Sequence, residues 1–165
     1  MKINTELTHK DFLLLNIILF PRVKSNWISL IILIFFIAIF LAITKKPNDF
    51  VGYFAVTVGA IFGGVIGVAT GFLINLSVML FNVGKKSGVL GSHQFELLPE
   101  GLRESTSVNE SLQRWESIVE IKVYGKFLLL RINSYLFHVI PQRAFKNQTE
   151  FERFYQEAIN LKSAA

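Results

Sequence analysis

The chain lacks cysteine, and parts of it lack charge altogether. Without cysteine, the 165 residues cannot form a disulfide framework, a thiolate metal site or a cysteine nucleophile. Aspartate is absent from residues 88–165, in which nine lysines and arginines balance nine glutamates. The net charge of +5 therefore comes from residues 1–87. Because a nucleic-acid-binding protein concentrates basic residues on its folded domain, this distribution argues against a nucleic-acid partner.

Two stretches, residues 27–44 and 51–81, contain no charged residue and are rich in apolar side chains. As a helix, the first extends about 27 Å, close to the roughly 30 Å of the hydrocarbon core of a bilayer. The second exceeds that length, so we expect residues 51–75 to form the second span. The short turn at residues 45–49 makes the two helices antiparallel neighbours. The sequence thus predicts a transmembrane hairpin over residues 27–81, with the lipid bilayer as its partner.

Small residues recur at every fourth position of the second stretch, which places them on one face of a helix. Such a row lets two transmembrane helices approach closely, and the first stretch offers alanines as small partners. The predicted helix-packing residues are Ala55, Gly59, Gly63, Gly67, Gly71, Ala38 and Ala42. We expect them to close an intramolecular hairpin, and a homo-oligomer packed through the same row is the alternative.

Basic residues flank the predicted hairpin unequally. The turn holds two lysines, whereas the side of the termini holds six basic residues: Lys2, Lys10, Arg22, Lys24, Lys85 and Lys86. Cytoplasmic segments carry the excess of lysine and arginine, so both termini are expected in the cytoplasm, at a bacterial inner membrane. A cleaved signal peptide is disfavoured, because 26 residues precede the first stretch and no small-x-small cleavage site follows it.

Residues 1–26 precede the hairpin and are expected to form a cytoplasmic segment of their own. Residues 2–7 alternate loosely, as in an edge strand. Thr8 and Asp11 have the spacing of a helix start, which predicts an interfacial helix after them. The pattern leaves open whether its apolar run, residues 12–20, lies in the membrane interface or packs on the soluble domain.

The pattern changes to a period of two beyond a linker rich in Gly, Lys and Ser at residues 82–92. Residues 93–165 are therefore expected to form a soluble domain. Alternation and turn signals predict an antiparallel meander of about five strands. An apolar stripe predicts a closing helix over residues 148–162. The predicted fold class is α+β: a two-helix transmembrane hairpin followed by a small antiparallel β-sheet domain with a C-terminal helix.

Three motifs follow one another in this C-terminal part. They are G-x-H-x-F-E-L-x-x-E-G-L from Gly91 to Leu102, a tryptophan followed by Ile-x-x-Ile (Trp115, Ile118, Ile121), and I-P-x-R-A-F from Ile140 to Phe145. With two spans before them and a helix after them, they resemble the YcxB-like family, which usually has lysine where Gln142 stands here. The resemblance implies a membrane-anchored pleckstrin-homology-like (PH-like) domain with no catalytic residues to carry over. Its motif and core residues here are Phe95, Leu97, Gly101, Trp115, Ile140, Pro141 and Phe145.

Side chains that could carry chemistry are few. His93 and His138 fall on predicted strands, which leaves a shared site open, and His9 lies in the N-terminal segment. A metal site needs three or four ligands, so the pattern favours ordinary histidines. The nine glutamates of the soluble part are scattered, which favours a solvated surface over acid–base catalysis. We therefore expect no enzyme activity, no metal and no cofactor.

The favoured function is a PH-like interaction or scaffold module that is anchored in the inner membrane and binds a protein, a peptide or a lipid headgroup. Basic residues beside the membrane are candidates for contacts with headgroups: Lys85, Lys86, Arg143 and Lys146. The alternative function is a homo-oligomeric channel or transport-associated component, packed through the glycine-rich second span.

Overall fold

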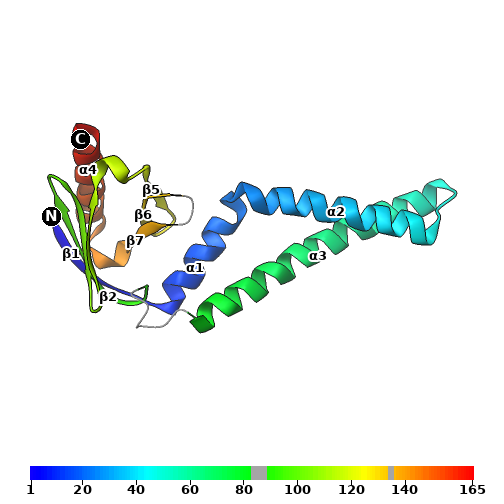
Figure 1. Cartoon of the computed structure of the whole chain (residues 1–165), viewed down its shortest axis with the longest axis horizontal. Coiled ribbons are helices and arrows are strands. Elements are labelled where there is room, and N and C mark those ends of the chain that lie inside the picture. Colours follow the sequence, from blue (N-terminus) through cyan, green and yellow to red (C-terminus); the bar gives the residue numbers. More distant parts are fainter. Residues whose placement is uncertain (83–88, 134–135) are drawn as a thin grey trace. The chain divides into compact units, whose positions relative to one another are not determined.

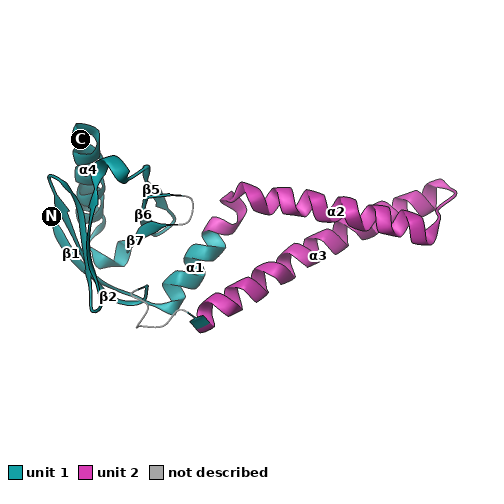
Figure 2. Cartoon of the chain, in the orientation of Figure 1, with its two compact units in different colours: residues 1–18, 82–165 teal, residues 19–81 magenta. Residues whose placement is uncertain are grey.

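The computed structural model describes residues 1–82, 89–133 and 136–165. Contacts divide the chain into two compact units (Figure 2). One unit joins Met1–Ile18 to Asn82–Ala165, and the other consists of Leu19–Phe81. The first unit, called the β-domain below, is therefore discontinuous in sequence, and the second, called the hairpin unit, is inserted between its two parts.

The hairpin unit consists of a short 3-10 turn, η1 (Phe20–Arg22), and two long helices. Helix α2 spans Lys24–Lys45 and helix α3 spans Phe50–Asn82 (Figure 1). At 1.5 Å per residue, α3 extends about 50 Å without interruption. Both helices are long and apolar enough to cross a membrane. This confirms the two predicted apolar helices, and α3 continues past the expected end of the second span at residue 75.

The connection between α2 and α3 is short because both helix ends are closed locally. Lys46 adopts a left-handed conformation (φ 45°), and its amide donates to the Ala42 carbonyl over 3.1 Å. The Asp49 carboxylate accepts a hydrogen bond from the Gly52 amide at 2.7 Å, which caps α3. A Cβ added to Gly52 would lie only 2.9 Å from the Pro47 Cβ, so this tight turn requires glycine.

Helix α3 packs against α2 through a row of every fourth residue that lies beside the predicted glycine row. The most buried members are Ala60, which is 1% exposed, and Gly64. Beyond them the half-buried side chains become larger, with Val68 and Phe72. Phe72 meets Phe20 of η1, with ring centroids 4.2 Å apart. The side chains between the helices therefore increase in size from the turn toward the open end of the hairpin.

The β-domain contains two antiparallel sheets in its described part (Figure 1). The first sheet has four strands, in the order β1 (Lys2–Leu7), β2 (Gly91–Leu98), β3 (Gly101–Thr106) and β4 (Glu110–Arg114). The second has three, in the order β5 (Glu120–Tyr124), β6 (Phe127–Arg131) and β7 (Phe137–Pro141). Strand β1 pairs with β2 in the register Ile3↔Phe95, although the whole hairpin separates the two strands in sequence.

Helix α4 (Gln148–Ala164) closes the β-domain. Asn147 caps it by accepting a hydrogen bond from the Glu150 amide at 2.9 Å, and the Glu150 carboxylate accepts one from the Lys146 amide at 2.8 Å. Its predicted apolar stripe faces the sheets, with Phe154 and Ala158 fully buried. One continuous core therefore joins α4 to residues of both sheets.

Helix α1 (His9–Leu19) packs on the β-domain through residues up to Ile18, which agrees with one of the two alternatives left open for residues 12–20. Its Leu15 is 5% exposed, and the Ile18 side chain lies against Gly125, in the turn between β5 and β6. The opposite face keeps an apolar surface exposed, with Leu14 and Ile17. The helix ends directly before Phe20-Pro21, because a proline disfavours helical geometry in the residue before it.

The sheets differ from the expected meander in two ways. The sequence predicts one sheet of about five strands, whereas the structure has two sheets that include β1 from the N-terminal segment. A 3-10 turn (Trp115–Ser117) separates β4 from β5. The reason is that Trp115 anchors in the core, where its Nε1 donates to the Leu98 carbonyl over 2.9 Å. The expected linker contains residues 83–88, which lie outside the described part.

Candidate functional site

The surface of the hairpin unit is the first candidate site, because its largest apolar side chains point outward. Phe35 and Phe36 of α2 are 62% and 64% exposed, and Phe62 of α3 is 65% exposed. In the most apolar 18-residue segment of α2, no residue is buried within the protein. In the corresponding segment of α3, 11% of the residues are buried. A core helix of a water-soluble protein would bury most of this area, since apolar burial is what stabilises such proteins. The two helices are therefore candidates for membrane spans.

Glycines of α3 are the contact points between the two helices. A Cβ added to Gly67 would lie 2.6 Å from the Leu33 Cδ2, and one added to Gly64 would lie 2.4 Å from the Ile34 Cγ1. Cβ atoms added to Gly59 and Gly63 would lie farther from α2, at 3.4 Å from the Leu41 Cδ1 and 3.2 Å from the Ile37 Cδ1. The partner groups on α2 are thus bulky aliphatic side chains that fill the space left by glycine.

Other members of the predicted packing set lie outside this contact. Ala55 is exposed, and a Cβ added to Gly71 would meet nothing within 4 Å. Ala38 and Ala42 are half-buried on the face of α2 that carries the contact side chains. The tightest approach falls at Gly64, one position beyond the predicted row, because Ile34 extends toward that position.

The basic residues proposed for headgroups have different surroundings. Lys85 and Lys86 lie outside the described residues. Lys146 is exposed beside the start of α4. The Arg143 side chain forms an ion pair with Asp11 and donates a hydrogen bond to the Glu6 carbonyl at 2.7 Å. Arg143 therefore ties the segment after β7 to the start of α1, and its contact with headgroups stays a prediction.

Asp11 is held ionised by the groups around it. Burial raises the pKa of its carboxyl, but hydrogen bonds from Thr8 and Arg143 outweigh that effect, so the pKa lies below its ordinary value. Thr8 donates to Asp11 through both its amide, at 2.9 Å, and its hydroxyl, at 2.7 Å. This is the predicted helix start, and it joins α1 to the rest of the β-domain.

The second candidate site is a buried cluster of His93 on β2, Glu104 on β3 and His138 on β7. The His93 Nδ1 lies 2.8 Å from one carboxylate oxygen of Glu104, and the His138 Nδ1 lies 2.7 Å from the other. Both rings are buried, at 4% and 8% exposed, and both lie near Phe95, with centroids 5.9 and 6.2 Å from it. The cluster therefore connects the two sheets through a single carboxylate.

The charge state of Glu104 follows from these contacts. Burial raises the pKa of its carboxyl, but the hydrogen bonds from His138 and His93 outweigh this and lower the pKa to about 2. An ionised carboxylate only accepts hydrogen bonds, so both Nδ1 atoms must carry the protons. The Nε2 atoms of both rings are buried and have no hydrogen-bond partner among the described residues.

This arrangement favours a structural connection over catalysis. A general base must come within about 2.6–3.2 Å of the proton that it removes, and both free ring nitrogens are buried away from solvent. In the described residues, no group of three His, Cys, Asp or Glu side chains is arranged to hold a metal ion. The expectation of solvated glutamates is wrong for Glu104, whose side chain is only 18% exposed. Alternation along β3 could have shown its inward position, because Leu102 and Glu104 lie on one face.

The motif residues that carry the family resemblance lie in the core of the β-domain. Phe95, Trp115 and Ile140 are 0% exposed, and Leu97 and Phe145 are nearly as buried. Gly101 lies where β3 meets β4 so closely that an added Cβ would be 2.3 Å from the Gln113 carbonyl oxygen. Pro141 ends β7 and is buried. The motifs therefore specify packing of the β-domain.

Comparison with known proteins agrees with this core. Residues 97–158 match the YcxB-like protein family model. The match begins in β2 and ends in α4, so it covers Glu104 and His138 but neither β1 nor the hairpin unit. It confirms the resemblance to the YcxB-like family over these residues. No curated protein and no solved structure matches the chain.

Proposed function

We propose that the protein is a membrane-anchored PH-like interaction module, with the hairpin unit as its anchor. The observation that carries the proposal is the outward-facing apolar surface of α2 and α3, exposed along nearly the whole length of both helices. Such a surface costs about 25 cal/mol per Å² in water, and a hydrocarbon environment removes that cost. Since neither helix contains a charged residue between Trp27 and Thr44 or between Val51 and Phe81, no charge opposes insertion.

The connectivity of the β-domain supports placing both ends of the anchor on the same side of the membrane. Strand β1 precedes the hairpin and β2 follows it, yet they pair over Lys2↔Glu96 through Leu7↔Gly91. Two segments that pair in one sheet must lie in the same compartment. Both ends of the hairpin therefore emerge on the side of the β-domain, and the excess of basic residues there favours the cytoplasm.

The architecture of the β-domain supports the PH-like assignment. Two antiparallel sheets in meander order precede a helix whose apolar stripe enters their common core. Within the described residues, the buried polar cluster of His93, Glu104 and His138 connects the two sheets. We propose that this domain presents its outer surface to a protein, peptide or lipid-headgroup partner.

The test combines extraction and topology of the full chain. We expect the protein to remain in the membrane fraction after alkaline carbonate treatment. A reporter fused after Ala165 should report a cytoplasmic location, as should one fused before Met1. Release by carbonate would refute the anchor, and reporters on opposite sides of the membrane would refute the paired β1 and β2.

The second candidate function is a homo-oligomer, because small residues remain on the exposed face of α3 at Ala55 and Gly71. A pore is less well supported. The hydroxyls of Thr57 and Ser77 donate to the carbonyls of Tyr53 and Leu73 in their own helix, and this removes polar groups from a pore lining. Light scattering in detergent decides between these functions, since a monomeric mass excludes the oligomer.

A further inference from the structure

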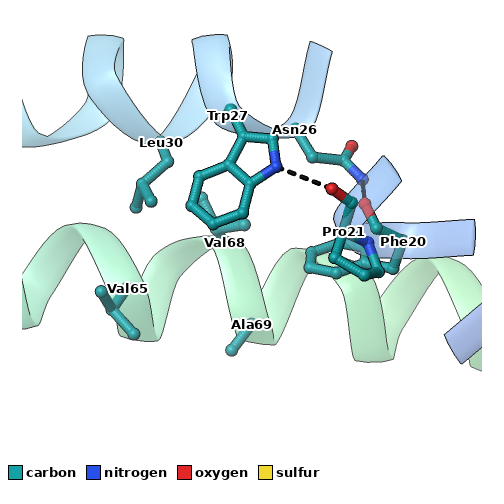
Figure 3. A pocket seen from close by; sticks show the side chains of 8 residues that line it. All are labelled: Phe20, Pro21, Asn26, Trp27, Leu30, Val65, Val68 and Ala69. Atoms are coloured by element: carbon teal, nitrogen blue, oxygen red, sulfur yellow. Dashed lines mark hydrogen bonds between the residues drawn. The ribbon is translucent and has the colours of Figure 1, made fainter. Parts of the chain in front are cut away.

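The hairpin unit contains an apolar pocket between α2 and α3, near the open end of the hairpin (Figure 3). Its volume is about 240 Å³. Figure 3 shows Trp27 and Leu30 entering from α2, Val68 from α3, and Phe20 and Pro21 from η1 at one end. In this pocket no lining residue carries a charge. Its position and its lining raise the question of what occupies it.

The pocket follows from the sizes of the side chains between the helices. On one side of it, Leu33 enters the space above Gly67, where the helices are in close contact. On the other side, the Phe20 and Phe72 rings meet and keep η1 and α3 apart. Neither contact fills the interval between them, so the widening of the hairpin leaves a gap.

The polar side chains at the pocket, Asn26 and Trp27, each donate a hydrogen bond to a carbonyl of η1. Helical geometry is interrupted after η1 at Val23, which is extended, so the carbonyls of Phe20 and Pro21 are available to side chains. The Asn26 Nδ2 donates to the Phe20 carbonyl at 2.7 Å, and the Trp27 Nε1 donates to the Pro21 carbonyl at 2.8 Å (Figure 3). The pocket therefore presents mainly hydrocarbon to its occupant, and a charged ligand would find no ion-pair partner among its lining residues.

We infer that this pocket binds an acyl chain of a membrane lipid, an inference that rests on the proposed membrane anchor. The surrounding surface of both helices is apolar and exposed, for example Ile31 at 67% and Ile66 at 62%, so lipid chains would surround the opening. The volume lies below the roughly 300–1,000 Å³ that encloses a whole drug-sized ligand. It suits a segment of an alkyl chain whose remainder continues into the bilayer.

Quenching by brominated lipid tests the inference in the full-length protein. Dibrominated phosphatidylcholine is titrated into the purified protein in detergent micelles, with the unbrominated lipid as reference. Trp27 lines the pocket and Trp115 is fully buried in the β-domain, so a Trp27→Phe variant supplies the unquenched baseline. We expect quenching of Trp27 that saturates near one lipid per chain.

Filling the pocket from α3 gives the decisive variants. Ala69→Phe, which adds a ring to the pocket wall, should remove the saturable component and leave only quenching proportional to the lipid fraction. Ala55→Phe, the same substitution at an exposed alanine of the same helix outside the pocket, should keep it. Val68→Phe provides a second filling variant if the helix content of Ala69→Phe, measured by circular dichroism, is reduced.

Three outcomes would overturn the inference. One is quenching that never saturates in the parent protein. Another is saturable quenching that both filling variants retain. The third is a dimer that Ala69→Phe dissociates, in the absence of saturable quenching, because this would identify a second copy of the chain as the occupant. Extraction by alkaline carbonate separates the proposals, since a protein that is retained in the membrane but shows no saturable quenching loses only the lipid site.

Discussion

The hairpin unit and the β-domain place the same types of apolar side chain in opposite environments: the β-domain buries them, and the hairpin unit exposes them. In the β-domain, Phe154 is 0% exposed and packs with Phe145, with ring centroids 5.3 Å apart. In the hairpin unit, Phe62 and Phe40 are 65% and 64% exposed. The β-domain is therefore stabilised by removing apolar area from water, whereas the two helices of the hairpin unit meet in close contacts at glycine and keep most of their apolar area exposed. The comparison shows that apolar content alone does not define a core.

The largest expected effect contrasts two phenylalanines. Phe154→Ala should lower the free energy of unfolding of the β-domain by about 3–5 kcal/mol, because it leaves a cavity in a closed core. Phe62→Ala should change the free energy of unfolding of the β-domain by less than about 0.5 kcal/mol, since the Phe62 ring is exposed on the hairpin unit. Denaturant unfolding in detergent, followed by the fluorescence of Trp115, measures both. Equal losses of unfolding free energy in the two variants would contradict the finding that Phe154 is buried and Phe62 is exposed.

The next effect concerns the polar connection inside the β-domain. Glu104→Gln should destabilise this domain by about 1.5–3 kcal/mol at pH 7, because the amide oxygen cannot accept from both His93 and His138 as the two carboxylate oxygens do. The exposed Glu116→Gln is the matched control and should be neutral. Denaturant unfolding of each full-length variant measures the difference. A neutral Glu104→Gln would show that the cluster does not hold the two sheets together.

The same carboxylate predicts an acid-dependent loss of stability. The folded-state pKa of Glu104, about 2, lies below its ordinary value of 4.5. Its stabilising contribution is therefore complete above pH 4.5 and is lost as the pH falls from 4.5 toward 2. Thermal unfolding over this range should show a decline that Glu104→Gln reduces. An unchanged decline in that variant would assign the acid sensitivity to other groups.

A smaller effect separates two glycines of α3. Gly64→Leu should weaken the hairpin by about 1–3 kcal/mol, because the new side chain would collide with Ile34. Gly71→Leu should have little effect, since an added Cβ there meets nothing within 4 Å. Loss of helix on heating in detergent, followed by circular dichroism, compares them. If both variants melt together, the helices do not pack through the face that contains Gly64.

The smallest effect tests the link between α1 and the segment after β7. Arg143→Gln removes a partly exposed ion pair with Asp11, so it should cost about 0.2–1 kcal/mol and less at high salt. If Arg143 also contacts headgroups, the variant should bind anionic vesicles more weakly. Lys146→Gln is the control for stability alone, because the described hydrogen bond of Lys146 is made by its backbone amide, while its side chain is itself a headgroup candidate. Unaltered vesicle binding would leave Arg143 with its structural contact alone.

Much of the fold could be predicted from local pattern. Charge-free length predicted both apolar helices, alternation predicted the inward Phe95 and Leu97, and the stripe with Phe154 predicted the closing face of α4. These features depend on residues close in sequence, so their periods are visible without a partner. The motif residues were likewise predictable as core, because Trp115 and Pro141 lie at strand ends and a large aromatic side chain at such a position normally packs in the core.

The candidate sites were less predictable because they depend on pairs far apart in sequence. The row on α3 that faces α2 is displaced from the predicted one, since residues four apart drift around a helix by about 40° per step and the bulky Ile34 selects which row it meets. His93 and His138 meet at Glu104 only because β7 lies against the first sheet. No local period marks either event.

The amino-acid sequence by itself determined where the chain is apolar, where it turns, and which residues alternate inward in each strand. Only the tertiary structure decided that β1 completes a sheet whose other strands follow the hairpin. It also decided that the helices close on Gly64 and leave a pocket beside Trp27. The physical reason is that local patterns report backbone geometry and solvent preference. The choice of partner depends instead on the shapes of side chains that meet only in the folded chain.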